Sequence, residues 1–169
     1  MAMNTVNSKQ KIVNRGFALL IAVIFMSVML SFGLALGSLG YKQQVLASSA
    51  IASQYAFYAA DAALECALYA DQRQNLFAFP PSDPSSAPAM TCDAAAPVSA
   101  SKSLSVSQWV VTNRLSLDSN KRCADVTIYK YSAPLSSGAT TYIFSQGYDV
   151  PCSDVGNVRF VSRGQSAHY

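Results

Sequence analysis

Charged residues are scarce in this sequence, and histidine and tryptophan occur once each. Only 12% of the 169 residues are Asp, Glu, Lys or Arg, whereas a typical soluble domain has about 25%. The scarcity of charge excludes a disordered polyelectrolyte and a highly basic nucleic-acid binder. Because 51% of the residues are hydrophobic, part of this chain, which has the length of one ordinary domain, is expected to lie outside water.

The net charge of +3 has a local origin. Lys9, Lys11 and Arg15 lie in the first fifteen residues, where there is no acidic residue, and the other nine basic residues balance the nine acidic ones. The net charge is therefore a property of the first fifteen residues. It says nothing of an acidic partner for the rest of the chain.

An uncharged run of 26 residues follows, from Gly16 to Tyr41. As a helix it would be about 39 Å long, enough to cross a hydrocarbon core of about 30 Å. The basic residues before the run indicate a cytoplasmic N-terminus, with the chain after Lys42 outside. Two ordinary interpretations are an uncleaved membrane anchor and a cleaved secretory signal, for which Gly33 and Ala35 form a weak cleavage pattern.

No proline interrupts the chain before Pro80. Apolar residues recur every three or four positions through the segment 42–79, which predicts an amphipathic helix that continues the uncharged run. One helix is thus expected from Phe17 to about Asn75. Five prolines between Pro80 and Pro97 then predict a loop over residues 80–101.

The last segment, residues 102–169, has the β-branched and aromatic residues that are typical of strands. Four strands are expected, over residues 105–113, 122–131, 140–150 and 157–163. The link 132–139 contains Pro134 and Gly138, so the second and third strands should form a hairpin. Short connections favour an antiparallel sheet packed on the helix, which predicts an α+β fold.

Four cysteines lie on the predicted outer side of the membrane: Cys66, Cys92, Cys123 and Cys152. The register of the predicted hairpin brings Cys123 near Cys152, and this leaves Cys66 to pair with Cys92. Each disulfide would close a short loop, worth about 3 kcal/mol in the chain-entropy model. An oxidising exterior fits this use of cysteine.

No constellation of catalytic residues stands out in the sequence. Asp61 and Glu65 lie four residues apart on one helix face, which is typical of solvated surface residues. His168 is the only histidine and lies next to the last residue, and no cysteine pair has the spacing of zinc ligands. The sequence therefore predicts no enzymatic activity, no cofactor, no metal site and no nucleic-acid partner.

The motif Gly16-Phe17-Ala18-Leu19-Leu20 follows a short basic leader and opens the apolar helix. It resembles the class III signal of type IV pilins and pseudopilins. The segment 55–65, with the sequence YAFYAADAALE, is similar to the second half of the helix in PilX-like minor pilins. The predicted order of long helix, loop and antiparallel sheet is also that of the pilin fold.

This resemblance implies that a prepilin peptidase cuts between Gly16 and Phe17 and that the new amine of Phe17 is N-methylated. The cut would separate a leader, residues 1–16, from a membrane and filament-core helix, residues 17–41. The subunit would span the cytoplasmic membrane, among its lipids, until an inner-membrane assembly platform adds it to an extracellular filament of other pilin subunits. Filaments for motility, adhesion, secretion and DNA uptake share this plan.

Two positions depart from the pattern of major pilins. Ile21 stands where those proteins have a glutamate, five residues into the mature chain, and Ser38 stands where many have a kinking proline. Without the glutamate, the amine of Phe17 lacks its expected partner in an apolar surrounding, which is costly. The departures favour a low-copy minor subunit with a tip or priming role. The alternative is an extracellular binding module that is held or released by an ordinary signal or anchor helix.

Overall fold

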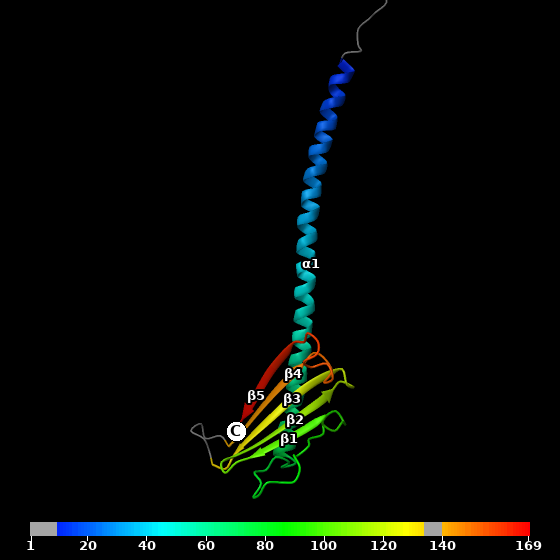
Figure 1. Cartoon of the computed structure of the whole chain (residues 1–169). Coiled ribbons are helices and arrows are strands. Elements are labelled where there is room, and N and C mark those ends of the chain that lie inside the picture. The colour runs from blue at the N-terminus through cyan, green and yellow to red at the C-terminus, as the bar shows by residue number, and fades with distance from the viewer. Residues whose placement is uncertain (1–9, 134–139) are drawn as a thin grey trace, which may run out of the picture. The chain divides into compact units, whose positions relative to one another are not determined.

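The computed structural model describes residues 10–133 and 140–169. One helix and five strands lie within these residues (Figure 1): α1 Gln10–Gln72, β1 Ser99–Leu104, β2 Gln108–Leu117, β3 Arg122–Tyr131, β4 Thr141–Tyr148 and β5 Ser162–His168. The chain divides into two compact units, Met1–Ala47 and Ser48–Tyr169. Most of the predicted leader, and the predicted turn with Pro134 and Gly138, lie outside the described residues.

Helix α1 ends at Gln72, three residues before Asn75, where the sequence pattern places its end, and within the predicted helical segment 42–79. Asn75 adopts a left-handed conformation with φ of 52°, which asparagine tolerates better than most residues and which is common just after a helix. The amide of Leu76 donates a hydrogen bond of 3.0 Å to the carbonyl of Ala70. The chain therefore turns away before the first proline is reached.

The five strands form one antiparallel sheet in the order β1-β2-β3-β4-β5, which confirms the α+β prediction. Strand β3 has the predicted ends, and β4 pairs with it so that Cys123 lies opposite Tyr148, as the hairpin predicts. Strand β2 begins at Gln108 and continues to Leu117, four residues past its predicted end.

The two edge strands differ from the prediction. Strand β1, Ser99–Leu104, lies partly in the segment assigned to the proline-rich loop, so that there are five strands and not four. Strand β5 is Ser162–His168 and not 157–163, because the residues after Tyr148 form a loop in which the Asp149 side chain accepts a hydrogen bond from the Val161 amide. Both edge strands are rich in serine and lack the apolar alternation that identifies a half-buried strand.

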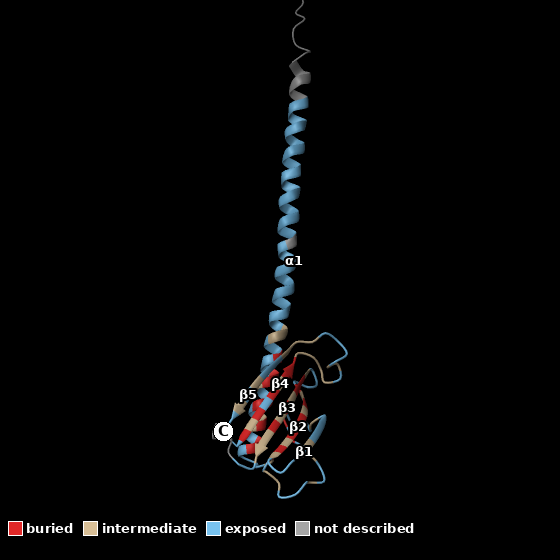
Figure 2. Ribbon diagram, turned by 60° about the vertical axis from the view of Figure 1, so that its left-hand side comes forward, coloured by how far each residue is buried: buried red, intermediate tan, exposed pale blue. Residues whose placement is uncertain are grey.

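The core of the Ser48–Tyr169 unit lies between the alanine-rich part of α1 and one face of the sheet (Figure 2). Strand β2 alternates regularly between buried and half-buried residues, and its buried side chains include Trp109, Val111 and Leu115. Small side chains on the facing part of α1 allow the helix to lie close to the sheet: Ala56, Ala59, Ala60, Ala63, Ala67 and Ala70 are all buried.

Helix and sheet approach each other closely at Gly147 of β4. A Cβ atom placed there would overlap backbone atoms of Ala56 and Ala60, and would lie 2.9 Å from the carbonyl carbon of Ala59. Two residues earlier on the strand, the Ser145 hydroxyl donates a buried hydrogen bond of 2.8 Å to the carbonyl of Ala60. Glycine and serine therefore fix where α1 crosses β4.

Candidate assembly helix and disulfide-pinned loops

The predicted processing position lies in the first unit, within α1. Gly16 and Phe17 are both exposed, with 68% of Phe17 accessible. Ile21, which stands at the position of the family glutamate, is 50% exposed, and the large apolar side chains after it are exposed as well. The described side chains around the Gly16–Phe17 bond thus leave it uncovered.

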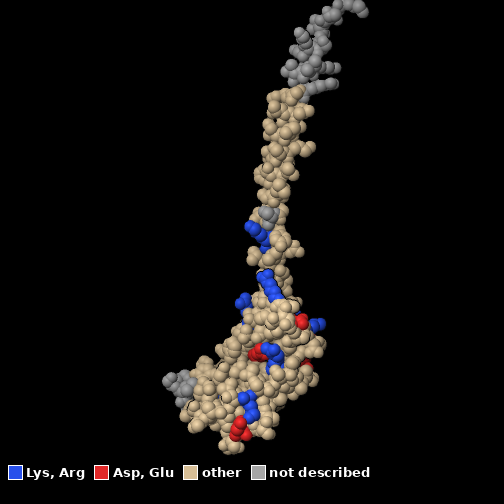
Figure 3. Space-filling view, in the orientation of Figure 1, with Lys and Arg blue, Asp and Glu red and all other residues tan. Residues whose placement is uncertain are grey.

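Among the described residues, one helix is long and apolar enough to cross a membrane, and none of its most apolar window is buried. From Gly16 to Tyr41 the helix has no charged residue, and on the face drawn in Figure 3 this stretch shows neither blue nor red atoms. An exposed apolar helix of this length is unstable in water, because every large side chain on it would be hydrated. The run is therefore suited to lipid or to a coat of other apolar helices.

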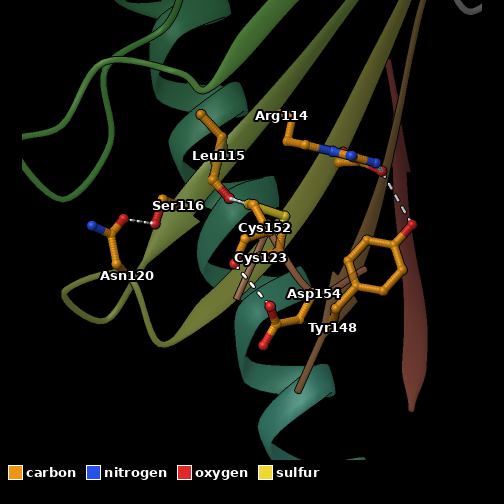
Figure 4. Close-up of a disulfide and its surroundings, with 10 residues drawn as sticks. Arg114, Leu115, Ser116, Asn120, Cys123, Tyr148, Cys152 and Asp154 are labelled. Carbon is orange, nitrogen blue, oxygen red and sulfur yellow. Dashed lines mark hydrogen bonds and ion pairs between the residues drawn. A yellow bond between two sulfur atoms is a disulfide. The ribbon is translucent and has the colours of Figure 1, made fainter. Parts of the chain in front are cut away.

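Two disulfides are present in the second unit, Cys66–Cys92 and Cys123–Cys152. This is the pairing that the predicted hairpin favours. The first joins α1 to the proline-rich loop, with 6.1 Å between the Cα atoms. The second joins the start of β3 to the loop after β4, and the sulfur of Cys152 lies 3.1 Å from the carbonyl oxygen of Leu115 (Figure 4).

The proline-rich loop is held by more than its disulfide. Phe77 and Met90 are buried in the core, and the buried side chain of Asn113 accepts a hydrogen bond from the Met90 amide at 3.2 Å. The amide nitrogen of the same side chain donates to the carbonyl of Pro88 at 3.1 Å. The sequence pattern did not identify Asn113 as a residue that holds this loop. Its only signal in the sequence is an asparagine at an inward position of a strand.

The comparisons with known proteins add no relative to this description. No family model, no curated protein and no solved structure matches the chain. The functional interpretation therefore depends on the residues and on the geometry of the two units.

One buried carboxylate ties the end of α1 to the C-terminus. Asp71 is 4% exposed and lies 2.6 Å from the Lys130 ammonium of β3. The hydroxyl of Tyr169 donates a hydrogen bond to the same carboxylate oxygen of Asp71. Burial, and then this hydrogen bond, raise the pKa of Tyr169 well above its usual value.

A second ion pair lies on the sheet face that points away from α1. Arg114 and Asp125 form two hydrogen bonds of 2.7 Å, and Tyr148 donates a third to Asp125 at 3.1 Å (Figure 4). The hydrogen bond to Asp125 raises the pKa of Arg114, so its charge is fixed. Burial, together with the charge of Asp125, raises the pKa of Tyr148.

A groove of about 530 Å³ runs between α1 and the β2–β3 turn. Arg122 and Tyr55 both line this groove, and the Arg122 guanidinium lies 3.8 Å from the centroid of the Tyr55 ring. The same guanidinium pairs with the Asp118 carboxylate at 2.6 Å. Asp61 is half-buried and Glu65 is exposed on the helix nearby. Within the described parts of the chain, no three His, Cys, Asp or Glu side chains gather as metal ligands would.

Proposed function

We propose that this chain is a minor pilin or pseudopilin, a structural subunit of a type IV pilus or of a related secretion or DNA-uptake filament. One observation carries the proposal: within α1, the exposed and uncharged stretch begins at the Gly16-Phe17 motif and continues in the same helix into the alanine-rich segment that packs on the sheet. Removal of this segment as a secretory signal would cut through a helix that continues into the folded domain.

The exposed apolar helix suggests how the subunit would pass from membrane to filament. In lipid, the side chains after Phe17 contact acyl chains, and in a filament they would contact the same kind of helix from other subunits. Because lipid tails are as apolar as leucine, the exchange costs little apolar contact, and packing decides it. Gly33, Gly37 and Gly40 have no neighbour within 4 Å of an added Cβ, so these positions are open to close approach by another helix.

Ile21 favours a low-copy role within this proposal. An isoleucine cannot neutralise the terminal amine of a neighbouring subunit, so a filament built only from this chain would bury one unpaired charge for each subunit. A subunit placed at the tip or used in priming makes fewer such contacts. Deletion of the gene should therefore reduce the number of filaments or their function, and filaments of normal number and function would contradict the role.

The mature N-terminus tests the proposal most directly. The full chain is co-expressed with a prepilin peptidase, and the membrane-extracted protein is analysed by intact mass and peptide mass spectrometry. We expect a chain that begins with N-methyl-phenylalanine at Phe17. The Gly16→Ile variant should keep its leader, whereas the matched variant Gly33→Ile, in the same helix, should be processed normally.

Two other outcomes would contradict the proposal. Cleavage after Ala35 or Gly37 would identify a secreted module with an ordinary signal. An intact N-terminus that carries Met1, in cells with active peptidase, would identify a plain membrane anchor.

A further inference from the structure

The sheet has an outer face, which is the face that points away from α1. Ile128 of β3 and Ile143 of β4 point toward α1 and are buried. Because side chains alternate along a strand, the residues on either side of them lie on the outer face. At one end of this outer face, four aromatic side chains gather on β3, β4 and β5: Tyr131, Tyr142, Phe144 and His168. The rings of Tyr131 and Tyr142 meet edge to face at 6.1 Å, and those of Tyr142 and His168 stack at 5.4 Å with 16° between their planes.

The position of Phe144 depends on a glycine in the neighbouring edge strand. Phe144 is 44% exposed, and two atoms of its ring lie 3.2 Å from where a Cβ of Gly164 would be. The ring therefore lies over the backbone of β5, in space that any other residue would fill. Beside this ring is a shallow depression of about 390 Å³, which is lined by Tyr129, Tyr142 and Phe144 among others.

A second depression, of about 310 Å³, adjoins the first and shares Phe144 with it. Its other walls are polar: Thr112 and Thr127, whose hydroxyls lie 3.2 Å apart, the Arg114–Asp125 pair, and Gln146. The side chains of Arg114 and Asp125 are 35% and 23% exposed, so both reach solvent. Each depression lies at the small end of the range of small-molecule sites, about 300–1,000 Å³.

The charge of this surface limits its partner. Among the described residues that line the two depressions, Arg114 and Asp125 are the charged ones, and each neutralises the other. Nucleic acids bind where Lys and Arg exceed the acidic residues, because phosphate contacts supply most of the affinity, and anionic lipids need the same excess. A neutral face with hydroxyl, amide and paired charged groups complements a partner that is uncharged and rich in hydroxyls.

We propose that the outer face of the sheet binds a neutral oligosaccharide of hexopyranose units. The face of a pyranose ring presents several polarised C–H groups, which pack on the negative face of an aromatic ring such as that of Phe144 or Tyr142. The neighbouring sugar would lie in the polar depression. There its hydroxyls hydrogen-bond to Gln146 and to the outward lone pairs and N–H groups of the Arg114–Asp125 pair, which form stronger bonds than neutral groups do.

Binding is tested with the full chain in lipid nanodiscs, since a detergent with a sugar headgroup would compete. The probes are the neutral hexasaccharides maltohexaose, cellohexaose and hexa-N-acetylchitohexaose. Their binding is measured by saturation-transfer difference NMR and isothermal titration calorimetry. We expect at least one of them to bind, with the strongest saturation on the C–H protons of one pyranose face. No filament is involved, so this result and the processing of Phe17 can fail separately.

Variants locate the site. Phe144→Ala and Tyr142→Ala should weaken binding at least tenfold, and Gln146→Leu should weaken it while leaving the aromatic rings in place. Tyr58→Ala, which removes a 63% exposed ring from α1, is the matched control and should bind as the original chain does. Far-ultraviolet circular dichroism checks that each variant is folded.

Three outcomes would overturn the proposal: no binding of any of the three oligosaccharides, equal binding by the Phe144, Tyr142 and Tyr58 variants, or tighter binding of the oligonucleotide dT10 than of the sugars. The last outcome would identify a nucleic-acid surface, and its affinity would fall steeply with salt.

Discussion

At residue 147, only glycine fits between β4 and α1. Gly147→Ala would place a methyl group against the helix backbone at Ala56 and Ala60, which can move only if the whole helix shifts. Overpacking of this kind costs about 1–3 kcal/mol, occasionally more. We expect a loss of at least this range in the free energy of unfolding, measured by urea titration with the fluorescence of Trp109, which is 1% exposed.

The neighbouring residue supplies the control for this prediction. Gln146→Ala changes the next side chain of the same strand, on the outer face, and should alter the unfolding free energy by less than about 0.5 kcal/mol, as surface changes usually do. Equal stability of the two variants would show that α1 does not approach β4 as described.

Tyr169 predicts a loss of stability at alkaline pH. Its pKa is raised by burial and by the hydrogen bond to Asp71, so folding favours the protonated hydroxyl. The stabilisation is complete below the pKa of an unfolded tyrosine, about 10, and is lost as the pH rises toward the folded pKa. The unfolding free energy should thus be level below about pH 10 and should fall above it, as urea titrations from pH 8 to pH 11 would show.

The unfolding free energy of the Tyr169→Phe variant should fall less steeply above pH 10 than that of the original chain. Part of the fall should remain, because the pKa of Tyr148 is also raised. Tyr69→Phe, which changes a tyrosine that is 60% exposed, should keep the original slope. If the Tyr169→Phe variant lost stability above pH 10 as steeply as the original chain, Tyr169 would not be the cause of that loss.

Among the elements, the two disulfides hold two different loops. The double variant Cys66→Ser/Cys92→Ser should lose about 3 kcal/mol of stability, as a crosslink over a loop of this length is expected to supply. It should also become sensitive to limited proteolysis between residues 73 and 91, which mass spectrometry of the fragments would detect. The sheet itself should stay intact, because the pairing of β2, β3 and β4 does not involve this loop.

The double variant Cys123→Ser/Cys152→Ser is the matched control. The sequence separations of 26 and 29 residues are similar, so the loss of stability should be similar too. Cleavage should move to the loop between residues 149 and 161. Protease sensitivity at the same place in both double variants would contradict the separate roles of the two crosslinks.

The elements also show how far the sequence predicts this fold. Strand β3 and its pairing with β4 were predictable because β-branched and aromatic residues alternate along both, and the register then paired the cysteines. The edge strands β1 and β5 were not predictable, because their polar residues are selected by pairing with one neighbour and not by burial. A polar edge strand leaves no periodic signal.

Of the two candidate surfaces, one was predictable from the sequence and the other was not. The uncharged helix is apparent from composition alone, since a stretch of 26 residues without charge is longer than the buried helix of a soluble domain requires. The aromatic outer face is different, because Tyr142 and Phe144 could each have pointed toward α1. Their orientation was fixed only when Gly147 and Ser145, on the same strand, were found against the helix.

At the scale of the whole molecule, the two units require different solvents. The Ser48–Tyr169 unit has a core, disulfides and ion pairs, as a water-exposed domain does. From Gly16 to Tyr41 the first unit has no charged residue, and its large apolar side chains are exposed. We therefore expect the uncharged run alone to retain the chain in membranes.

Charges placed in that run test this division. Met26→Arg/Leu30→Arg puts two arginines near its centre, each costing about 2.5–3.5 kcal/mol in a membrane helix. We expect alkaline carbonate to release this variant from membranes, or the cell to degrade it, while the original chain stays in the pellet. Leu46→Arg/Ile51→Arg changes two exposed apolar residues of the same helix beyond Lys42, and should stay in the pellet. Since both double variants add two positive charges, equal extraction of the two would mean that the membrane-embedded part of α1 is not the run from Gly16 to Tyr41.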